Sequence, residues 1–270
     1  MSQLRIAVVA PLYESVPPKL YGGTERVVYF LTEELVANGH QVTLFASGDS
    51  KTSARLVAPT ERSLRLDTSC QDHLSHHIIQ LQMVQNEIEN FDIIHYHIDF
   101  LHYPLSSINQ SSHVTTLHGN LNIPDLRNLY RMYDEIPVVS ISKDQRKPLF
   151  WLNWVGNVYH GLPPDLFRPN FQAGKYLAFL GRISPEKRVD RAIEIAKACD
   201  VPLKIAAKVD RNDQEYFDKS IRRKLNHPLI EFVGEINEKQ KEDFLGNAMA
   251  LLFPIDWPEP FGLVMIESMA

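Results

Sequence analysis

The sequence predicts an α/β protein made of two consecutive parallel-sheet domains. Short apolar runs of strand length alternate with amphipathic helical segments along the whole chain, which is the pattern of repeated β-α-β units. Residues 162–175 interrupt this alternation with a stretch rich in proline and polar residues, which indicates a linker and a domain boundary. We therefore predict an N-terminal Rossmann-like domain over residues 1–165 and a C-terminal one over residues 166–270.

Composition and charge exclude several classes of protein. The chain has 270 residues, 44% of them hydrophobic, which is enough to bury two moderate cores. Its net charge of −5 gives no basic excess for a nucleic-acid partner. Cys70 and Cys199 form no CxxC motif, so we expect a reducing, cytoplasmic environment. The apolar run at 6–12 is too short to span a membrane and lacks a signal-peptide cleavage site.

The first β-α-β unit contains a glycine-rich loop. Residues 4–10 are predicted to form a strand, the helix begins after Thr24 as its N-cap, and residues 41–46 form the next strand. The loop between the first strand and the helix contains Gly22 and Gly23 but no GxGxxG motif. These glycines either let backbone N–H groups approach an anionic or sugar ligand or form a tight turn.

The rest of the first domain is rich in histidine. We expect a helix over 76–88, strands over 91–96, 113–117 and 136–141, and an extended segment over 155–160. One histidine group comprises His73, His76 and His77, and another comprises His95, His97 and His102 with Asp99. Metal binding is one interpretation of each group. We favour solvated helix residues for the first group and polar lining of a cleft for the second.

The second domain repeats the same alternation. We expect strands over 176–181, 202–207, 230–234 and 248–253, and helices after residue 188, over 214–225 and over 239–245. A further helix begins after the Pro-Phe-Gly turn at 260–262.

Two charged groups stand at the ends of strands in the second domain. Arg182 and Lys187 follow the first strand and could clamp a pyrophosphate, although a solvated cationic helix start is the alternative. Cations near a helix N-terminus oppose the helix dipole, and such a conflict with a local rule indicates function. Glu259 and Glu267 follow the last strand. They could accept hydrogen bonds from sugar hydroxyls or act as the acid and base of a glycoside hydrolase. The basic clamp implies a phosphorylated ligand and favours the first reading.

Five segments together resemble a known family. They are Tyr21-Gly22-Gly23-Thr24-Glu25, His118-Gly119, Phe179-Leu180-Gly181-Arg182 with Lys187, Phe232-Val233-Gly234, and the E-x7-E motif from Glu259 to Glu267 with its Pro-Phe-Gly turn. In this order and spacing the segments resemble glycosyltransferase family 4, the retaining, nucleotide-sugar-dependent enzymes of the GT-B fold. The resemblance covers essentially the whole chain.

The resemblance implies a role for each of these residues. It assigns catalysis to His118 and Glu259, and donor binding to Gly22, Gly23, Arg182, Lys187, Val233, Gly234, Phe261, Gly262, Leu263 and Glu267. Arginine and lysine of the basic loop would hold the donor diphosphate, and the second glutamate of the motif would bind the ribose. The donor sugar would contact Glu259, the backbone N–H groups of 261–263 and His118. Residues 233–234 would lie near the base, and the glycine pair would close over the diphosphate and the acceptor side.

The activity implied is transfer of a hexose from a nucleotide sugar with retention of configuration. The family needs no metal and no cofactor besides the nucleotide-sugar donor, and the acceptor would be a sugar, a lipid or another small molecule. The resemblance leaves peripheral association with a membrane open. Two alternatives remain: a truncated chain that binds nucleotide sugar with little catalysis, and a GT-B-fold nucleotide-sugar epimerase.

The sequence departs from the family pattern in three places. His160-Gly161 stands where the family often has Asn-Gly, and 207–210 replaces a glycine-rich turn. Family members also continue past Ala270 with further strands and helices, the last of which crosses back to the first domain. We therefore expect the second domain to be incomplete and the chain to be truncated at its C-terminus.

Overall fold

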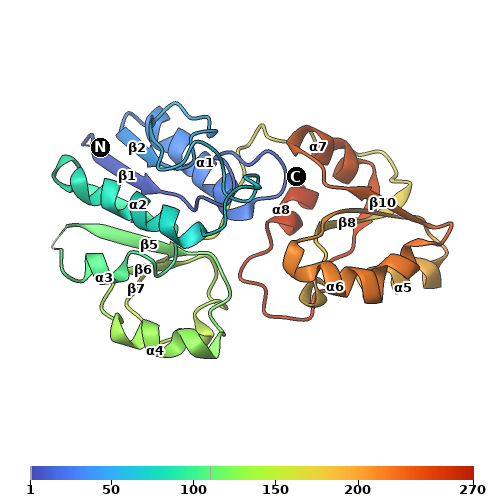
Figure 1. Ribbon diagram of the computed structural model, residues 1–270. Helices are drawn as coiled ribbons and strands as arrows, with labels where there is room; N and C mark the ends of the chain where they lie inside the picture. Colours follow the sequence, from blue (N-terminus) through green and yellow to red (C-terminus); the bar gives the residue numbers. More distant parts are fainter. Residues whose placement is uncertain (1, 110) are drawn as a thin grey trace. The chain divides into compact units, whose positions relative to one another are not determined.

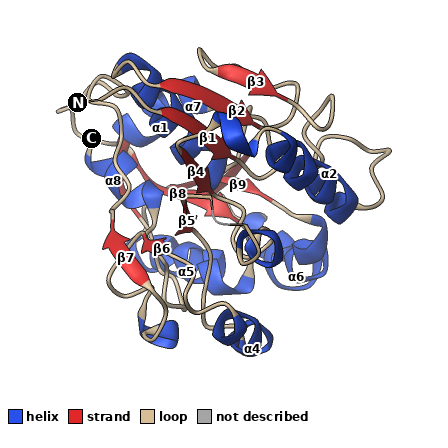
Figure 2. Ribbon diagram, turned by 90° about the vertical axis from the view of Figure 1, so that its left-hand side faces the viewer, coloured by secondary structure: helices blue, strands red, loops and turns tan. Residues whose placement is uncertain are grey.

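The computed structural model describes residues 2–109 and 111–270, which form two compact units. Unit 1 ends at Gly161 and unit 2 runs from Leu162 to Ala270, whereas the sequence predicted the boundary at 165/166. Each unit contains one sheet with helices packed against it (Figures 1 and 2). Every strand pair in both sheets is parallel, so the predicted architecture of two consecutive parallel-sheet domains is confirmed.

Unit 1 contains a seven-stranded sheet in the order β3-β2-β1-β4-β5-β6-β7. Its strands are β1 (Arg5–Val9), β2 (Gln41–Phe45), β3 (Arg55–Val57), β4 (Ile93–Tyr96), β5 (His113–Leu117), β6 (Val138–Ser140) and β7 (Trp154–Asn157). Central strand β1 has four consecutive buried residues, as expected for a strand covered on both faces. The three-residue edge strand β3 was not predicted, because its apolar run is too short to stand out.

Of the four α-helices that the structure describes in unit 1, two begin earlier than predicted and two were not predicted. They are α1 (Gly23–Ala37), α2 (His73–Asn86), α3 (Tyr103–Ser106) and α4 (Pro124–Met132), with 3-10 turns at Ile88–Asn90 and Lys147–Leu149. The prediction that Thr24 caps α1 is wrong: the N-cap is Gly22 and no side chain caps the helix. Helix α2 begins earlier than expected, because Asp72 accepts hydrogen bonds from the backbone N–H groups of Leu74 and Ser75.

Unit 2 contains a four-stranded sheet in the order β10-β9-β8-β11. Its strands are β8 (Tyr176–Arg182), β9 (Leu203–Lys208), β10 (Ile230–Gly234) and β11 (Ala248–Leu251). Its α-helices are α5 (Val189–Cys199), α6 (Gln214–Tyr216), α7 (Glu238–Gly246) and α8 (Leu263–Met269), with 3-10 turns at Pro185–Lys187, Arg211–Asp213 and Arg222–Leu225. The single helix predicted over 214–225 is instead α6, a π-helical stretch at Phe217–Ile221 and a 3-10 turn; nothing in the sequence explains this break.

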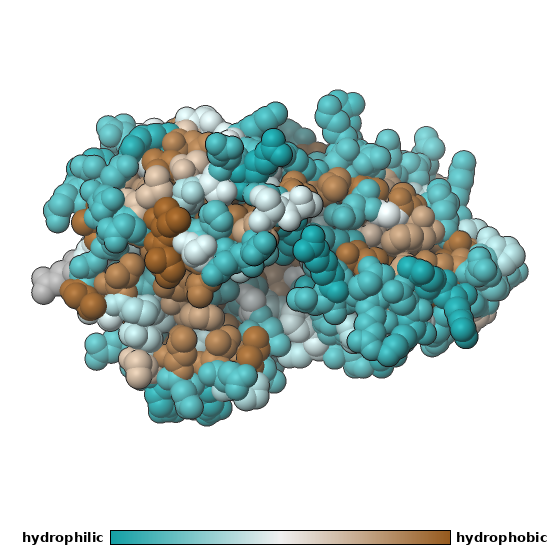
Figure 3. Space-filling model, viewed as in Figure 1, coloured by the Kyte–Doolittle hydropathy of each residue, from teal (hydrophilic) through white to brown (hydrophobic). Residues whose placement is uncertain are grey.

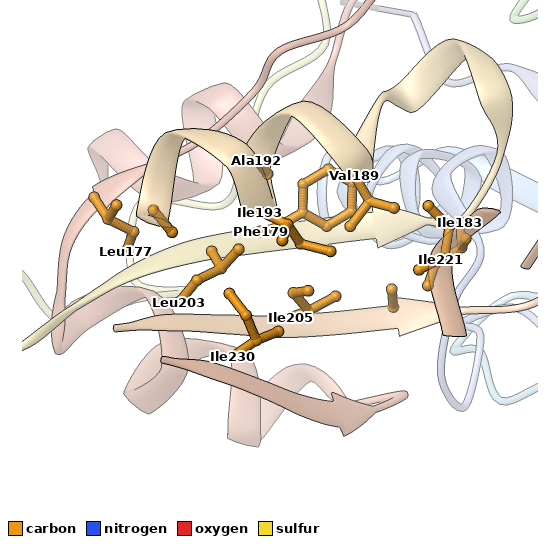
Figure 4. Close-up of a cluster of buried hydrophobic side chains, with 12 residues drawn as sticks. Leu177, Phe179, Ile183, Val189, Ala192, Ile193, Leu203, Ile205, Ile221 and Ile230 are labelled. Atoms are coloured by element: carbon orange, nitrogen blue, oxygen red, sulfur yellow. The ribbon is translucent and has the colours of Figure 1, made fainter. Parts of the chain in front are cut away.

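The core of unit 2 lies between β8, β9, β10 and helix α5. Figure 4 shows Leu177 and Phe179 of β8 facing Val189 and Ile193 of α5. Val189, Ala192, Ile193 and Ala196 are fully buried, which confirms the apolar face predicted for this helix.

The proline-rich segment 162–175 is part of unit 2. The side chain of Asn170 donates to the carbonyl of Gly246 at 2.7 Å, and the backbone N–H of Lys175 donates to the carbonyl of Asn247 at 3.1 Å. A Cβ at Gly174 would lie 2.2 Å from the backbone of Ala248. These contacts tie the segment to the start of β11.

Charged and polar side chains cover most of the face shown in Figure 3, with apolar patches between them. No helix in the described ranges 2–109 and 111–270 is both long enough and apolar enough to cross a membrane.

Candidate active site

Each sheet has one topological switch point, where ligands bind in open parallel sheets. In unit 1 the strand order reverses between β1 and β4, and in unit 2 it reverses between β8 and β11. The loops that follow these four strands contain most of the residues singled out in the sequence.

The two loops at the switch point of unit 2 are joined to each other. The backbone N–H of Asp256, in the loop after β11, donates to the carbonyl of Glu186 at 2.9 Å. The guanidinium of Arg188 donates to the Asp256 carboxylate at 2.8 Å. Arg188 has φ 55°, in the left-handed region, where it connects the 3-10 turn at Pro185–Lys187 to α5. The basic loop and the E-x7-E loop therefore form one local structure.

Lys187 and Glu259 form the centre of this structure. The Lys187 ammonium makes a hydrogen-bonded ion pair with Oε2 of Glu259, and the indole N–H of Trp257 donates to the same oxygen at 2.7 Å. The ammonium also lies 4.9 Å from the centroid of the Trp257 ring, within range of a cation–π interaction. Both charged side chains are 15% exposed. Two residues that are 72 positions apart are thus held together at the partly open end of the sheet.

Arg182 ends β8 beside three carboxylates. Its guanidinium lies 2.6 Å from Glu186, 3.4 Å from Asp213 and 3.9 Å from Asp210. Burial raises the pKa of the Asp213 carboxyl despite the nearby guanidinium. These carboxylates hold the arginine fork at the strand end, where an anionic ligand would compete with them for its N–H groups.

The turn before α8 depends on Gly262. Its φ is 83°, and a Cβ there would lie 2.9 Å from Cε of Met265 and 3.1 Å from Cζ of Phe253. Phe261 and Leu263 on either side are half-buried. The positive φ favours glycine here, and a Cβ would in addition displace the ends of these two side chains.

The second glutamate of the motif lies inside unit 2. Glu267, on α8, is 5% exposed, and its Oε1 accepts a hydrogen bond from the Lys241 ammonium of α7 at 2.6 Å. Lys241 was not identified from the sequence, because it lies 26 residues away in an ordinary charged helix.

Val233 and Gly234 lie at the end of β10, the edge strand next to β9. Val233 is 41% exposed, and Gly234 has φ 81° at a shift of register in the β10–β9 pairing. The Val233 side chain at this strand end is therefore open to solvent.

The switch point of unit 1 contains the glycine pair and a buried carboxyl. A Cβ at Gly22 would lie 2.7 Å from Cβ of Pro18 and 3.2 Å from Oε2 of Glu25, so this position requires glycine for space. Gly23 begins α1. Burial, with the nearby Glu14 carboxylate adding to it, raises the pKa of Glu25 to about 7. Glu14 itself is paired with Arg65 at 3.0 Å.

Four histidine rings follow one another on the other side of this switch point. The rings of His95 and His97 are 4.1 Å apart, those of His97 and His118 are 5.1 Å apart, and those of His118 and His160 are 5.3 Å apart and nearly parallel at 19°. Nδ1 of His97 and Nε2 of His118 share one hydrogen bond at 2.8 Å. Burial lowers the pKa of His95 and His160 to about 4 and lowers those of His97 and His118 well below the ordinary value. All four rings are therefore neutral at pH 7, and can exchange hydrogen bonds with a ligand but add no positive charge.

Asp99 and His77 complete the polar residues of this region. Asp99 has φ 50°; burial raises the pKa of its carboxyl to about 6, against the lowering effect of a hydrogen bond from the His118 backbone. His77 is 1% exposed and Nε2 of its ring accepts from the backbone N–H of Leu12 at 3.3 Å, so the prediction that it is a solvated helix residue is wrong. Within the described part of the chain, no group of three or more His, Cys, Asp or Glu side chains is arranged to hold a metal ion.

Two family models match the chain, one for each unit. Residues 21–154 match the model described as Glycosyltransferase Family 4, and residues 167–270 match the model described as Glycosyl transferases group 1.

Known proteins of this kind are similar along nearly the whole chain. An uncharacterized glycosyltransferase of Methanocaldococcus jannaschii is 22% identical, over 99% of this chain and 78% of the relative. Among solved structures, AviGT4, a glycosyltransferase involved in avilamycin A biosynthesis, is 23% identical with a TM-score of 0.72, over 98% of this chain and 76% of that one. Sucrose-phosphate synthase from Thermosynechococcus elongatus is 16% identical with a TM-score of 0.78, over 99% and 79%. These similarities confirm the predicted GT-B fold.

Proposed function

Because this chain belongs to the glycosyltransferases of family 4 and group 1, we propose that it moves a hexose from a nucleotide-sugar donor to an acceptor hydroxyl with retention of configuration. Family membership supports the transferase activity, a nucleotide-sugar donor and an acceptor. The hexose, the stereochemistry and the roles of individual residues are our proposal.

The observation that carries the proposal is the Lys187–Glu259 pair at the switch point of unit 2. A lone cationic loop would fit many anions, but here an ammonium and a carboxylate lie side by side under an indole. The ammonium suits a phosphate oxygen, and the carboxylate suits the hydroxyl groups of a sugar. A nucleotide sugar presents both kinds of group on either side of the bond that is cleaved.

The basic residues would stabilise the leaving group. When the bond between the anomeric carbon and the phosphate oxygen breaks, negative charge develops on the diphosphate. Arg182 would meet this charge with its planar fork and Lys187 with a compact ammonium. Binding would require both cations to exchange their present carboxylate partners for phosphate. We propose that these two residues neutralise the charge without a metal ion.

The remaining donor contacts follow the family assignment. The donor sugar would be held by Glu259 and the backbone N–H groups of 261–263. Glu267 would accept hydrogen bonds from the ribose hydroxyls. The base would lie against Val233 and Gly234. The pairing of Glu259 with Lys187 weakens the alternative of a glycoside hydrolase, because this carboxylate already accepts hydrogen bonds from the ammonium and from the Trp257 indole.

Unit 1 would supply the acceptor side and one histidine. We propose that Gly22 and Gly23 bring backbone N–H groups close to the ligands, and that the neutral His118 exchanges a hydrogen bond with the donor sugar. The acceptor oxygen would attack on the face from which the diphosphate departs, and its proton would pass to the departing phosphate oxygen. This route retains configuration and uses no protein nucleophile. We propose a sugar, a lipid or another small molecule as the acceptor. We also propose a cytoplasmic location, with which the two free thiols are compatible.

A donor panel tests this proposal. UDP-, GDP- and ADP-hexoses would be incubated with the chain and a mixture of sugar and lipid acceptors, and the products would be analysed by mass spectrometry and proton NMR. We expect one nucleotide class to be consumed, with the α configuration of the donor kept in the product. An inverted product would contradict the stereochemistry. Interconversion of the donor sugar without acceptor would indicate an epimerase, and tight binding without turnover would indicate a binding protein.

A further inference from the structure

Helices α7 and α8 are joined by a buried ion pair. The Lys241 ammonium lies 2.6 Å from Oε1 of Glu267 and 3.4 Å from Oε1 of Glu238. The side chains of Lys241 and Glu267 are 5% and 4% exposed. Lysine is almost never fully buried unless it is paired, so this contact is a built feature of unit 2.

Stability alone is a poor explanation for such a pair. Removing two charges from water costs about as much as their attraction returns, and well-packed apolar residues often serve as well or better. The neighbouring core position on the same helix face is Phe244, which is 7% exposed. A second apolar residue at 241 would extend that packing. The retained charge pair therefore points to a requirement on the direction of the carboxylate.

The burial of Glu267 makes the orientation of its carboxylate important for binding a ligand. Only a small part of the residue is open, so a ligand can reach it along few directions. Its helix, α8, is short and starts directly after Gly262, its N-cap, which has a positive φ. A hydrogen bond at 2.6 Å to one carboxylate oxygen fixes the plane of the group. One ammonium among two carboxylates also leaves a net negative charge, which suits acceptance of hydroxyl hydrogens.

We propose that Lys241 is a positioning residue that aims the Glu267 carboxylate at the two hydroxyl groups of the donor ribose. The inference rests on the proposed function, since it assumes that Glu267 meets the ribose. Lys241 itself does not contact the donor. Its contribution is confined to the discrimination between a ribose and a sugar that lacks the 2′-hydroxyl.

The test compares ribonucleotides with 2′-deoxyribonucleotides. Calorimetry would give the Kd of UDP, GDP and ADP and of their 2′-deoxy counterparts for the wild type, Lys241→Met, Lys241→Arg and Lys239→Met. Methionine keeps the unbranched shape and most of the length of the side chain without its charge, and Lys239 is an exposed residue of the same helix. Thermal melting by circular dichroism would check that each variant is folded; Lys241→Gln replaces Lys241→Met if the latter is not.

The expected result is a ribose preference that depends on Lys241. The wild type, Lys239→Met and Lys241→Arg would bind the ribonucleotide about tenfold or more tighter than the deoxy form, as expected for hydrogen bonds to a charged group. In Lys241→Met the ribonucleotide would weaken to within about threefold of the deoxy form, whose own Kd would stay unchanged. A merely structural role would weaken both nucleotides equally.

Each other outcome identifies what fails. A folded Lys241→Met protein that keeps the full ribose preference overturns the inference and leaves the proposed function intact. A wild type that binds diphosphates without ribose preference overturns the inference together with the role of Glu267. A wild type that binds none of the three diphosphates overturns the proposed function itself.

Discussion

Burial of the His160 ring makes the stability of unit 1 sensitive to acid. The substitution His160→Asn isolates the contribution of this one group. Burial lowers the pKa of the His160 ring from 6.5 to about 4. Between these values the unfolded chain binds a proton that the folded chain rejects, so stability is lost as the pH falls from the upper value through the lower one. Asparagine keeps a polar side chain at this position and does not titrate.

The size of the effect follows from the two pKa values. On going from about pH 7.5 to about pH 5.5, protonation of the unfolded histidine lowers the free energy of unfolding by about 1.3 kcal/mol through this one group. By about pH 3, below both pKa values, the loss would exceed about 3 kcal/mol. The substitution also removes the ring contact with His118, but that loss is common to both pH values and cancels in the comparison.

Urea unfolding followed by tryptophan fluorescence measures this difference. Trp257 would be replaced by phenylalanine, so that Trp151 and Trp154 report on unit 1 alone. We expect the loss of stability between the two pH values to be about 1.3 kcal/mol smaller in His160→Asn than in its parent. An identical loss in both proteins would refute the assignment of a buried, neutral ring at this position.

Three further predictions test other parts of the structure. Burial raises the pKa of Glu25 from 4.5 to about 7, so this carboxyl group favours the folded state at low pH and lowers its stability as the pH rises through that range. Glu25→Gln should therefore stabilise unit 1 by about 3 kcal/mol more at about pH 8 than at about pH 4. Urea titrations at the two pH values measure this difference, and a variant with the same pH dependence as its parent would contradict the prediction. Gly262→Ala should lower the stability of unit 2 by about 1–3 kcal/mol because of its positive φ and its contacts with Met265 and Phe253. Gly246→Ala, within helix α7, is the control and should change stability by less than about 1 kcal/mol. Both are measured by Trp257 fluorescence in a protein whose Trp151 and Trp154 are replaced by phenylalanine. Transfer activity should survive EDTA if Arg182 and Lys187 neutralise the diphosphate, and activity that is abolished by EDTA and restored by Mg²⁺ would show otherwise.

Local patterns were sufficient to predict the two sheets and the candidate loops. Runs such as 6–10 and 176–181 contain no charged side chain and are almost entirely apolar, because strands covered on both faces need no polar side chains. The basic loop at 182–188 and the motif from Glu259 to Glu267 are continuous in sequence, so their residue types and spacing could be recognised directly.

The pairings that build the site were not predictable from these patterns. Lys187 meets Glu259 only because β8 and β11 are neighbours in the sheet, and His160 meets His118 only because the chain returns beyond β7 to the end of β5. Lys241 gave no signal at all, since a lysine on a charged helix is normally exposed. The failed cap at Thr24 has a local cause: the backbone N–H of Arg26 already bonds to the Gly22 carbonyl at 3.2 Å, so the helical turn begins at the glycine pair.

The most direct test of the account is whether the loop after β8 binds the donor diphosphate. Calorimetry with UDP, GDP and ADP would compare the wild type with Arg182→Ala, Lys187→Met and the control Lys197→Met, an exposed lysine at the far end of α5. We predict that the wild type binds one of the three, that each loop variant binds it about tenfold or more weaker, and that the control binds as the wild type does. Equal affinities in all four proteins would contradict the assignment of this loop as the diphosphate site.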